Sequence, residues 1–167
     1  MGRNKALLPY KGSTLAQSVA EAVSAAAGAV YQVGNTNISC GFVPDIYPGE
    51  GPLGGILTAL QQSTADWNLI VACDMPQLSV DFLRQLLDAA ESCHGDALVP
   101  MGPSGRLEPL CAVYHRRCYK PLSQAFERGV RKIAAALEEV RTVTWPVSEL
   151  SCFQNVNTPE DWAPYER

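Results

Sequence analysis

Hydrophobic residues recur along the chain at two spacings, which predict alternating helices and strands. Leu15, Val19 and Val23 follow one another at four-residue steps and stop before Gly28, as on one face of an amphipathic helix. Residues 68–73 (NLIVAC) form an unbroken apolar run, which is typical of a strand covered on both faces. By these criteria we expect helices over residues 15–27, 52–63, 79–91, 116–127 and 130–139, and strands over residues 29–33, 41–45, 68–73, 96–101, 109–114 and 140–145.

Strands that alternate with helices predict an α/β protein: a three-layer, Rossmann-like fold whose mostly parallel sheet carries helices on both faces. The chain has 167 residues, of which 47% are hydrophobic, and shows no linker or repeat, so we expect one domain over residues 1–167. Residues 158–161 (TPED) predict the start of a last helix. Because ligands bind beyond the carboxyl ends of parallel strands, the loops to search are residues 34–37, 45–55, 74–76 and 101–108.

The net charge of the chain argues against some classes of binding partner. Thirteen Lys and Arg residues against seventeen Asp and Glu residues give a net charge of −4, which repels polyanions, so we expect neither nucleic acid nor a membrane surface as a partner. No apolar run is long enough to cross a bilayer or to serve as a secretory signal, so we expect a cytoplasmic protein. A small phosphorylated ligand stays compatible with this charge, because local amides and cations bind phosphate.

Six cysteines are present and none forms a Cys-x-x-Cys pair. Cys73, Cys111 and Cys152 lie in or beside apolar runs, so we interpret the cysteines as buried, reduced thiols. His94 and His115 lack metal-ligand spacing from any cysteine, which argues against zinc, and we assign neither histidine a role.

The segment PGEGPLGG carries a Gly-x-Gly-x-x-Gly pattern at Gly49, Gly51 and Gly54, with Asp74 twenty residues further on. This pattern alone indicates dinucleotide binding, and an NAD-binding oxidoreductase is one alternative. The preceding FVPDIYP contains two prolines where a strong strand is needed, and Pro52 removes an amide within the motif. A turn that lets a substrate approach the backbone at a helix start explains the glycines better.

The segment IVACDMP (residues 70–76) places a carboxylate directly after the most apolar strand. Asp74 is therefore expected at the rim of the sheet, where it can bind Mg²⁺, which needs only one or two protein carboxylates beside substrate phosphates. Asp45 and Asn35 follow neighbouring strands and are expected at the same rim. The alternative is that Asp74 serves only the turn.

Four segments together resemble a known family. They are MGRNKALLPYKGSTL (residues 1–15), GPLGG (51–55), CDMP (73–76) and FQNVNTPEDW (153–162). In this order and spacing they look like the molybdenum cofactor guanylyltransferases, nucleotidyltransferases with a glycosyltransferase-A-like fold (nucleotide-diphospho-sugar transferase-like). CDMP together with NVNTP is the more specific part of the resemblance, and Cys73 and Met75, which usually differ in the related cytidylyltransferases, favour guanine. A related cytidylyl- or other nucleotidyltransferase is an alternative.

The resemblance implies Mg²⁺-dependent transfer of GMP from GTP to molybdopterin with release of pyrophosphate. It implies that Lys5 contacts the triphosphate and that Asp74 binds the magnesium ion, the two acting as catalytic residues. It further implies that Asn35 and Asp45, together with Gly51 and Gly54 of the glycine turn, bind the nucleotide.

The acceptor side is implied in the same way. Asn155 and Asn157 match asparagines associated with molybdopterin, and Arg106 lies in a segment that borders the acceptor site in the family. An exposed turn arginine is the alternative for Arg106. The resemblance implies GTP and molybdopterin as small-molecule partners, and other cofactor-biosynthesis or molybdenum enzymes as protein partners.

Family members begin with an apolar strand and a glycine-rich loop ahead of the Met-Gly of MGRNK, and this chain has neither. We therefore expect an N-terminally incomplete domain whose first strand is missing, either because the start is assigned too late or because the chain is shortened. Since that strand is central, its neighbours would be left with unpaired edges. A non-catalytic partner module for molybdenum enzymes is the further alternative.

Overall fold

The computed structural model describes residues 5–34, 38–148 and 153. Its helices are η1 (Lys5–Leu7), α1 (Leu15–Ala27), α2 (Pro52–Gln62), α3 (Val80–Ser92), η2 (Arg116–Cys118), α4 (Tyr119–Glu127), α5 (Ile133–Ala136) and η3 (Leu137–Glu139). Its strands are β1 (Pro9–Tyr10), β2 (Ser13–Thr14), β3 (Tyr31–Val33), β4 (Gly41–Val43), β5 (Trp67–Val71), β6 (Ala97–Met101), β7 (Cys111–His115) and β8 (Thr142–Pro146). No helix in these ranges is both long and apolar enough to cross a membrane.

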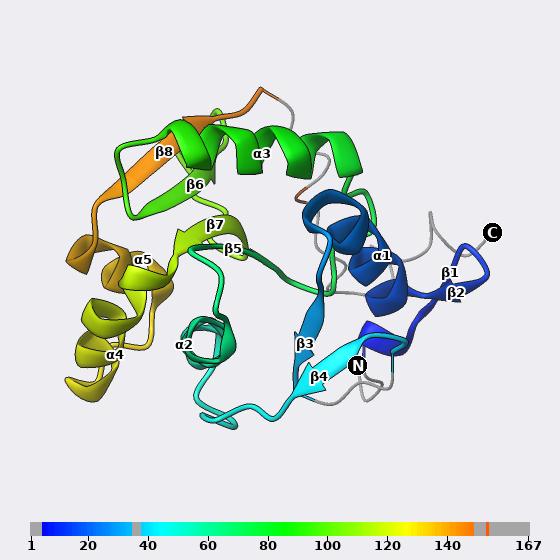
Figure 1. Cartoon of the computed structure of the whole chain (residues 1–167), viewed down its shortest axis with the longest axis horizontal. Coiled ribbons are helices and arrows are strands. Elements are labelled where there is room, and N and C mark those ends of the chain that lie inside the picture. Colours follow the sequence, from blue (N-terminus) through cyan, green and yellow to red (C-terminus); the bar gives the residue numbers. More distant parts are fainter. Residues whose placement is uncertain (1–4, 35–37, 149–152, 154–167) are drawn as a thin grey trace.

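The strands form separate sheets rather than one (Figure 1). Four of them have the order β5-β7-β6-β8, in which β7 is antiparallel to β5 and β6, and β8 is parallel to β6. Strands β5, β6 and β8 therefore point the same way and β7 is reversed. Strands β3 and β4 form a parallel pair of their own, and β1 and β2 form a short hairpin.

Helices cover both faces of the four-stranded sheet, as the alternating pattern predicts. Along β6, Ala97 and Val99 pack in one cluster with residues of α2 and α4, whereas Leu98, between them, packs with α3. The neighbouring strand β7 alternates in the same way, with Tyr114 on the first face and Val113 on the second. This two-residue alternation divides the core into two layers.

Local signals explain where the long helices begin. The Thr14 hydroxyl accepts a hydrogen bond from Gln17 N at 3.2 Å before α1, and the Ser79 hydroxyl accepts one from Phe82 N at 3.1 Å before α3. Both satisfy amides that have no partner within the helix. Helix α2 instead begins with Pro52 as its first residue, which needs no such partner.

Charged groups fasten the start of β6 to its neighbours. The Asp96 carboxylate accepts hydrogen bonds from Arg117 Nε and from Arg141 Nε and Nη2, both of the latter at 3.1 Å. The hydrogen bonds from Arg141, with the smaller help of Arg117, hold the pKa of Asp96 well below its ordinary value against the opposing effect of burial. The ionised carboxylate therefore links β6 to the segments before α4 and β8.

Most expected elements are confirmed within a few residues, but the strands lie in separate sheets rather than one, the β1–β2 hairpin was not predicted, and the helix expected over residues 116–127 begins as the separate η2. The strand expected over residues 29–33 is reduced to β3, and the helix expected over residues 130–139 is divided into the short α5 and η3. The reversal of β7 was not predicted, because its apolar sequence is the same for either direction. The helix start predicted at residues 158–161 lies outside the described residues.

Candidate functional site

Asp74 lies just beyond the carboxyl end of β5, as predicted. The strand ends at Val71, and Ala72 still donates a backbone hydrogen bond to Leu110 O at 2.7 Å, so the chain leaves the sheet only after this residue. Asp74 is half-buried, and its Oδ1 atom is buried. Next to it, Cys73 has a raised pKa, first because burial disfavours the thiolate and second because the Asp74 carboxylate is negative.

The N-terminal segment is tied to the turn that carries Asp74. Tyr10 Oη donates a 2.6 Å hydrogen bond to Pro76 O, and Tyr10 and Met75 are buried in the same cluster with Leu15 of α1. The backbone of Lys5 opens η1, five residues before Tyr10. The side chain of Lys5 lies outside the described part, so its contact with a triphosphate stays a prediction.

The glycine turn leads into α2, and glycine is required at Gly51 and at Gly54 for different reasons. Gly51 stands at the helix N-cap with a positive φ of 83°, a conformation that other residues adopt only with strain. At Gly54, an added Cβ would lie 2.9 Å from Tyr47 Cβ and 3.3 Å from Tyr47 O. Close packing on Tyr47 therefore explains Gly54 without a ligand, whereas its role in nucleotide binding stays a prediction.

Asp45 is held in a turn that sequence reasoning did not foresee. Its Oδ1 accepts hydrogen bonds from Tyr47 N at 3.0 Å and from the Thr58 hydroxyl at 3.1 Å, and that hydroxyl accepts one from Ile46 N. Thr58 is fully buried, and a hydroxyl within the apolar ILTAL stretch of a helix was the available signal. Asp45 thus stabilises this turn, and its contact with a nucleotide stays a prediction.

Arg106 lies in the loop between β6 and β7. Its Nε is 3.1 Å from Glu108 Oε1, and the arginine is mostly exposed whereas the glutamate side chain is only 9% exposed. Burial raises the pKa of Glu108, against the lowering effect of Arg106. Arg106 is therefore paired with Glu108 of the same loop, and its contact with a molybdopterin phosphate stays a prediction. The other predicted binding residues, Asn35, Asn155 and Asn157, lie outside the described residues.

Arg131, which has no role predicted from the sequence, supports the glycine turn. Arg131 Nε lies 2.7 Å from Glu50 Oε2, and its guanidinium carbon is 3.8 Å from the centre of the Phe126 ring. Phe126 in turn packs against Tyr47, with ring centroids 4.8 Å apart. The start of α2 is thus braced against α4 by one ion pair and one stack of side chains.

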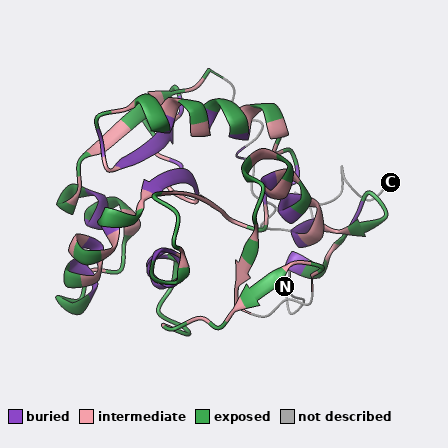
Figure 2. Cartoon of the chain, in the orientation of Figure 1, coloured by how far each residue is buried: buried purple, intermediate pink, exposed green. Residues whose placement is uncertain are grey.

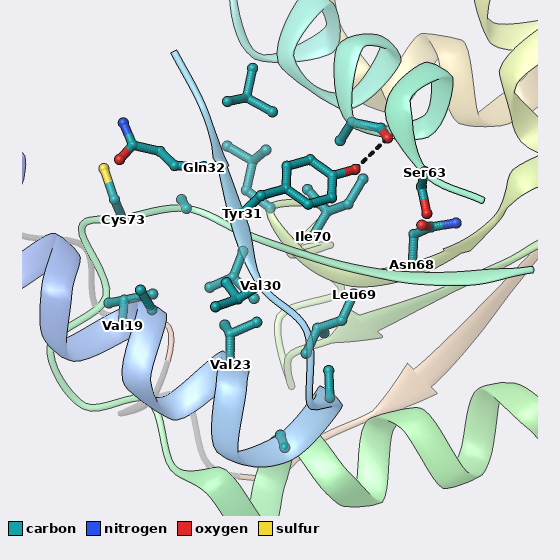
Figure 3. Close-up of a pocket in the computed structure, with 18 of the residues that line it drawn as sticks. Val19, Val23, Val30, Tyr31, Gln32, Ser63, Asn68, Leu69, Ile70 and Cys73 are labelled. Carbon is teal, nitrogen blue, oxygen red and sulfur yellow. Dashed lines mark hydrogen bonds between the residues drawn. The ribbon is translucent and has the colours of Figure 1, made fainter. Parts of the chain in front are cut away.

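A cavity of about 810 Å³ runs between β3 and β5, with Cys73 near one end (Figure 3). Asp74 is among the residues that line it. Helix α1 borders it on one side and α2 on the other, where Pro52 and Gly55 of the glycine turn also line it. We call it the interstrand groove. Asp74 and the start of α2, which the sequence analysis assigned to one site, therefore line the same hollow.

A family model described as a MobA-like NTP transferase domain matches residues 1–141. The chain belongs to this family. Among MobA-like relatives, a probable molybdenum cofactor guanylyltransferase of Trichormus variabilis is 32% identical over 174 residues, covering 98% of this chain and 83% of that protein. The molybdenum cofactor guanylyltransferase of Vibrio atlanticus is 32% identical over 168 residues, covering 96% and 85%.

Solved structures agree with the fold. Molybdopterin-guanine dinucleotide biosynthesis protein A of Archaeoglobus fulgidus has a TM-score of 0.84 and 29% identity, covering 99% of this chain and 90% of that one. The 2-C-methyl-D-erythritol 4-phosphate cytidylyltransferase of Thermus thermophilus has a TM-score of 0.74 at 19% identity, covering 97% and 92%, and shows the fold alone. The expected nucleotidyltransferase fold is confirmed, and the family finding favours it over an NAD-binding oxidoreductase.

The prediction of buried cysteines is wrong for Cys73, and Cys40 and Cys93 are only partly buried. Cys111 and Cys118 are buried as expected, and burial raises the pKa of Cys118 to about 12. Cys73 is exposed by its surface area, although neighbouring groups desolvate its sulfur enough to raise its pKa. It is exposed because β5 borders the interstrand groove rather than another strand. Cys152 lies outside the described residues.

Proposed function

We propose that this MobA-like domain transfers GMP from GTP to the terminal phosphate of molybdopterin. The observation that carries the proposal is the position of Asp74, which lies just beyond the carboxyl end of β5 and lines the same cavity as Pro52 and Gly55 of the glycine turn. The names of the relatives, which are guanylyltransferases, support guanine over cytosine.

The residues suit one magnesium ion held jointly by protein and substrate. Within the described ranges no group of three or more His, Cys, Asp or Glu side chains is arranged for a metal. A half-buried carboxylate such as Asp74 fits Mg²⁺ nonetheless, because this ion keeps several waters and takes substrate phosphates as its other ligands. When bound, the ion would neutralise charge on the triphosphate.

The chain's own groups then position the reactants. An oxygen of the molybdopterin phosphate forms a bond to the α-phosphorus of GTP, the bond from that phosphorus to the β-phosphate oxygen breaks, and pyrophosphate leaves with the electron pair. Lys5 is assigned to the departing phosphates, and Gly51 to close approach of the nucleotide at the start of α2. No protein nucleophile is needed, because such transfers depend on positioning and charge neutralisation.

Ligand-induced stabilisation tests the proposal. Thermal unfolding of the chain is recorded with GTP, CTP or NAD, each with and without Mg²⁺. A ligand at a hundred times its dissociation constant adds about 2.7 kcal/mol to the free energy of unfolding, so a true ligand is readily seen. We expect a GTP shift that requires Mg²⁺ and is larger than the CTP shift.

Replacing aspartate by asparagine at Asp74 and, as a control, at Asp81 distinguishes a ligand-binding carboxylate from a surface charge. Asp74→Asn is expected to abolish the Mg²⁺-dependent part of the GTP shift, whereas Asp81→Asn, at a side chain 89% exposed on α3, leaves it intact. A GTP shift that survives Asp74→Asn, or an NAD shift that ignores Mg²⁺, contradicts the proposal.

A further inference from the structure

Arg131, in the segment between α4 and α5, contacts the glycine turn from a distant part of the chain. Its Nε lies 2.7 Å from Oε2 of Glu50, the residue directly before Gly51. The two partners are 81 residues apart in the sequence, and they meet because α4 packs against α2 (Figure 1). The ion pair therefore ties the turn to a neighbouring helix rather than to the helix that the turn begins.

The end of α4 fixes the guanidinium of Arg131 before it meets Glu50. Its Nη1 donates hydrogen bonds to Phe126 O at 2.7 Å and to Val130 O at 3.2 Å. Its guanidinium carbon also lies 3.8 Å from the centre of the Phe126 ring. A planar guanidinium can donate in several fixed directions while it stacks on a ring, which the ammonium group of a lysine cannot do. The orientation of Nε towards Glu50 is therefore set by α4.

A pair of aromatic rings connects Arg131 to the turn a second time. The Phe126 ring on which the guanidinium lies packs against Tyr47, with ring centroids 4.8 Å apart. Tyr47 O accepts a 3.1 Å hydrogen bond from Glu50 N, and Gly54 packs closely on Tyr47. Arg131 thus supports both ends of the turn, Glu50 through the ion pair and Gly54 through the two rings.

We propose that Arg131 is a positioning residue for the nucleotide: by fixing Glu50 and Tyr47, it keeps the backbone at Gly51 in the conformation that GTP meets at the start of α2. This inference rests on the proposed guanylyl transfer, in which Gly51 is assigned to the nucleotide. A turn that already has its bound conformation loses less conformational freedom when the ligand binds. Arg131 therefore acts on GTP binding, and not on molybdopterin binding or on the bond changes near Asp74.

A second ion pair at the end of α4 supplies a matched control. Arg128 Nη2 lies 2.6 Å from Glu139 Oε1 of η3, and these side chains are 54% and 42% exposed, against 42% and 48% for Arg131 and Glu50. We expect Arg131→Ala to raise the dissociation constant of Mg²⁺-GTP and the KM for GTP about fivefold. The kcat and the KM for molybdopterin should stay within about twofold, as when binding common to ground and transition states is lost. Arg128→Ala should change none of these constants.

Substitutions of the partner separate positioning from a simple effect of charge. Glu50→Ala is expected to raise the KM for GTP about as much as Arg131→Ala, and the double variant no further, because the two side chains act as one unit. Arg131→Lys keeps the charge without the fork of donors and should fall between Arg131→Ala and the parent. Tighter GTP binding by Glu50→Ala would overturn the inference, because the carboxylate would then only repel the triphosphate.

Amide hydrogen exchange without ligand tests the support of the turn directly. The amides of Glu50 and Gly54 donate to Tyr47 O and Gly51 O, each at 3.1 Å, and should exchange faster in Arg131→Ala but not in Arg128→Ala. Unchanged exchange in Arg131→Ala would overturn the inference.

The binding measurements also separate this inference from the proposed function. A parent chain that binds no GTP overturns the proposed function and the inference with it. A parent that binds GTP, with an affinity that Arg131→Ala leaves unchanged or that Arg128→Ala lowers equally, overturns the inference alone.

Discussion

Two regions of this domain have similarly apolar strands but differ in burial: the packed half, with β6 and β7, and the half beside the interstrand groove, with β3, β4 and β5. In β7, Ala112 and Val113 are fully buried, and β6 is buried from Ala97 to Pro100. Every residue of β5 is only half-buried, although its run is equally apolar, and on β4 Phe42 is 60% exposed. Figure 2 shows the same contrast between the purple strands beneath α3 and the green strand β4. An apolar strand is buried only where neighbours lie on both sides.

This contrast also locates the candidate site. Asp74 follows the half-buried strand β5, and Gly51 opens the helix that covers one side of the groove. The candidate site lies where the buried strands β6 and β7 give way, through β5, to the interstrand groove. Substitutions should therefore act strongly in the packed half and weakly beside the groove.

The largest difference is expected from two isomeric side chains truncated to alanine. Leu98 of β6 is 2% exposed, and Leu98→Ala is expected to lower the free energy of unfolding by about 3 kcal/mol. Ile70→Ala, at a half-buried side chain of β5 that loses the same number of carbons, is expected to cost about 1 kcal/mol. Urea denaturation measures both. Equal losses would remove the distinction between the halves.

A smaller effect on the free energy of unfolding is expected at Asp96, whose ion pairs hold the start of β6. Asp96→Asn removes an ionised acceptor from Arg117 and Arg141, and is expected to cost about 2 kcal/mol at pH 7. The folded-state pKa of Asp96 lies below its ordinary value of 3.8, so its contribution is complete above about pH 4 and is lost as the pH falls further. The difference between variant and parent should therefore shrink below pH 4 in denaturation series.

Asp88→Asn is the control for this pH dependence, because Asp88 is an exposed carboxylate on α3. Its stability is expected to follow that of the parent at every pH. A constant difference between Asp96→Asn and the parent down to pH 2 would contradict the assigned role of the ionised carboxylate.

The smallest effects are expected at two adjacent glycines of α2: Gly54, which packs on Tyr47, and Gly55, which lines the interstrand groove. An added Cβ at Gly54 meets Tyr47, so Gly54→Ala is expected to cost about 1 kcal/mol. At Gly55, which lines the groove, no atom lies within 4 Å of the added Cβ, and Gly55→Ala is expected to gain about 0.5 kcal/mol from helix propensity. Thermal unfolding compares the two, and effects of the same sign would contradict the packing described.

Local patterns predicted the parts of this molecule that depend on local chemistry. The helices that begin near residues 15 and 79 and the position of Asp74 after β5 were predicted from the sequence. The contacts that depend on distant segments were not: Thr58 with Asp45, and Arg131 with Glu50. Their partners are set by how α2 meets the turn before it and α4 beside it, which no spacing reveals.

The sheet shows the same limit. The expectation of unpaired strand edges came from the family resemblance, not from the hydrophobic pattern, since β3 and β5 look like ordinary buried strands in sequence. The antiparallel pairing of β7 with β5 and β6 was also not predictable, because an apolar run has the same pattern in either direction.

The most direct test of the central claim is the transfer itself. The chain is incubated with Mg²⁺, molybdopterin and GTP labelled at the α-phosphate, and the label in the pterin dinucleotide is counted beside released pyrophosphate. We predict guanylyl transfer with one pyrophosphate per product, in preference to transfer from labelled CTP, and its loss in Asp74→Asn. Preferential use of CTP, or the absence of any labelled product, would contradict it.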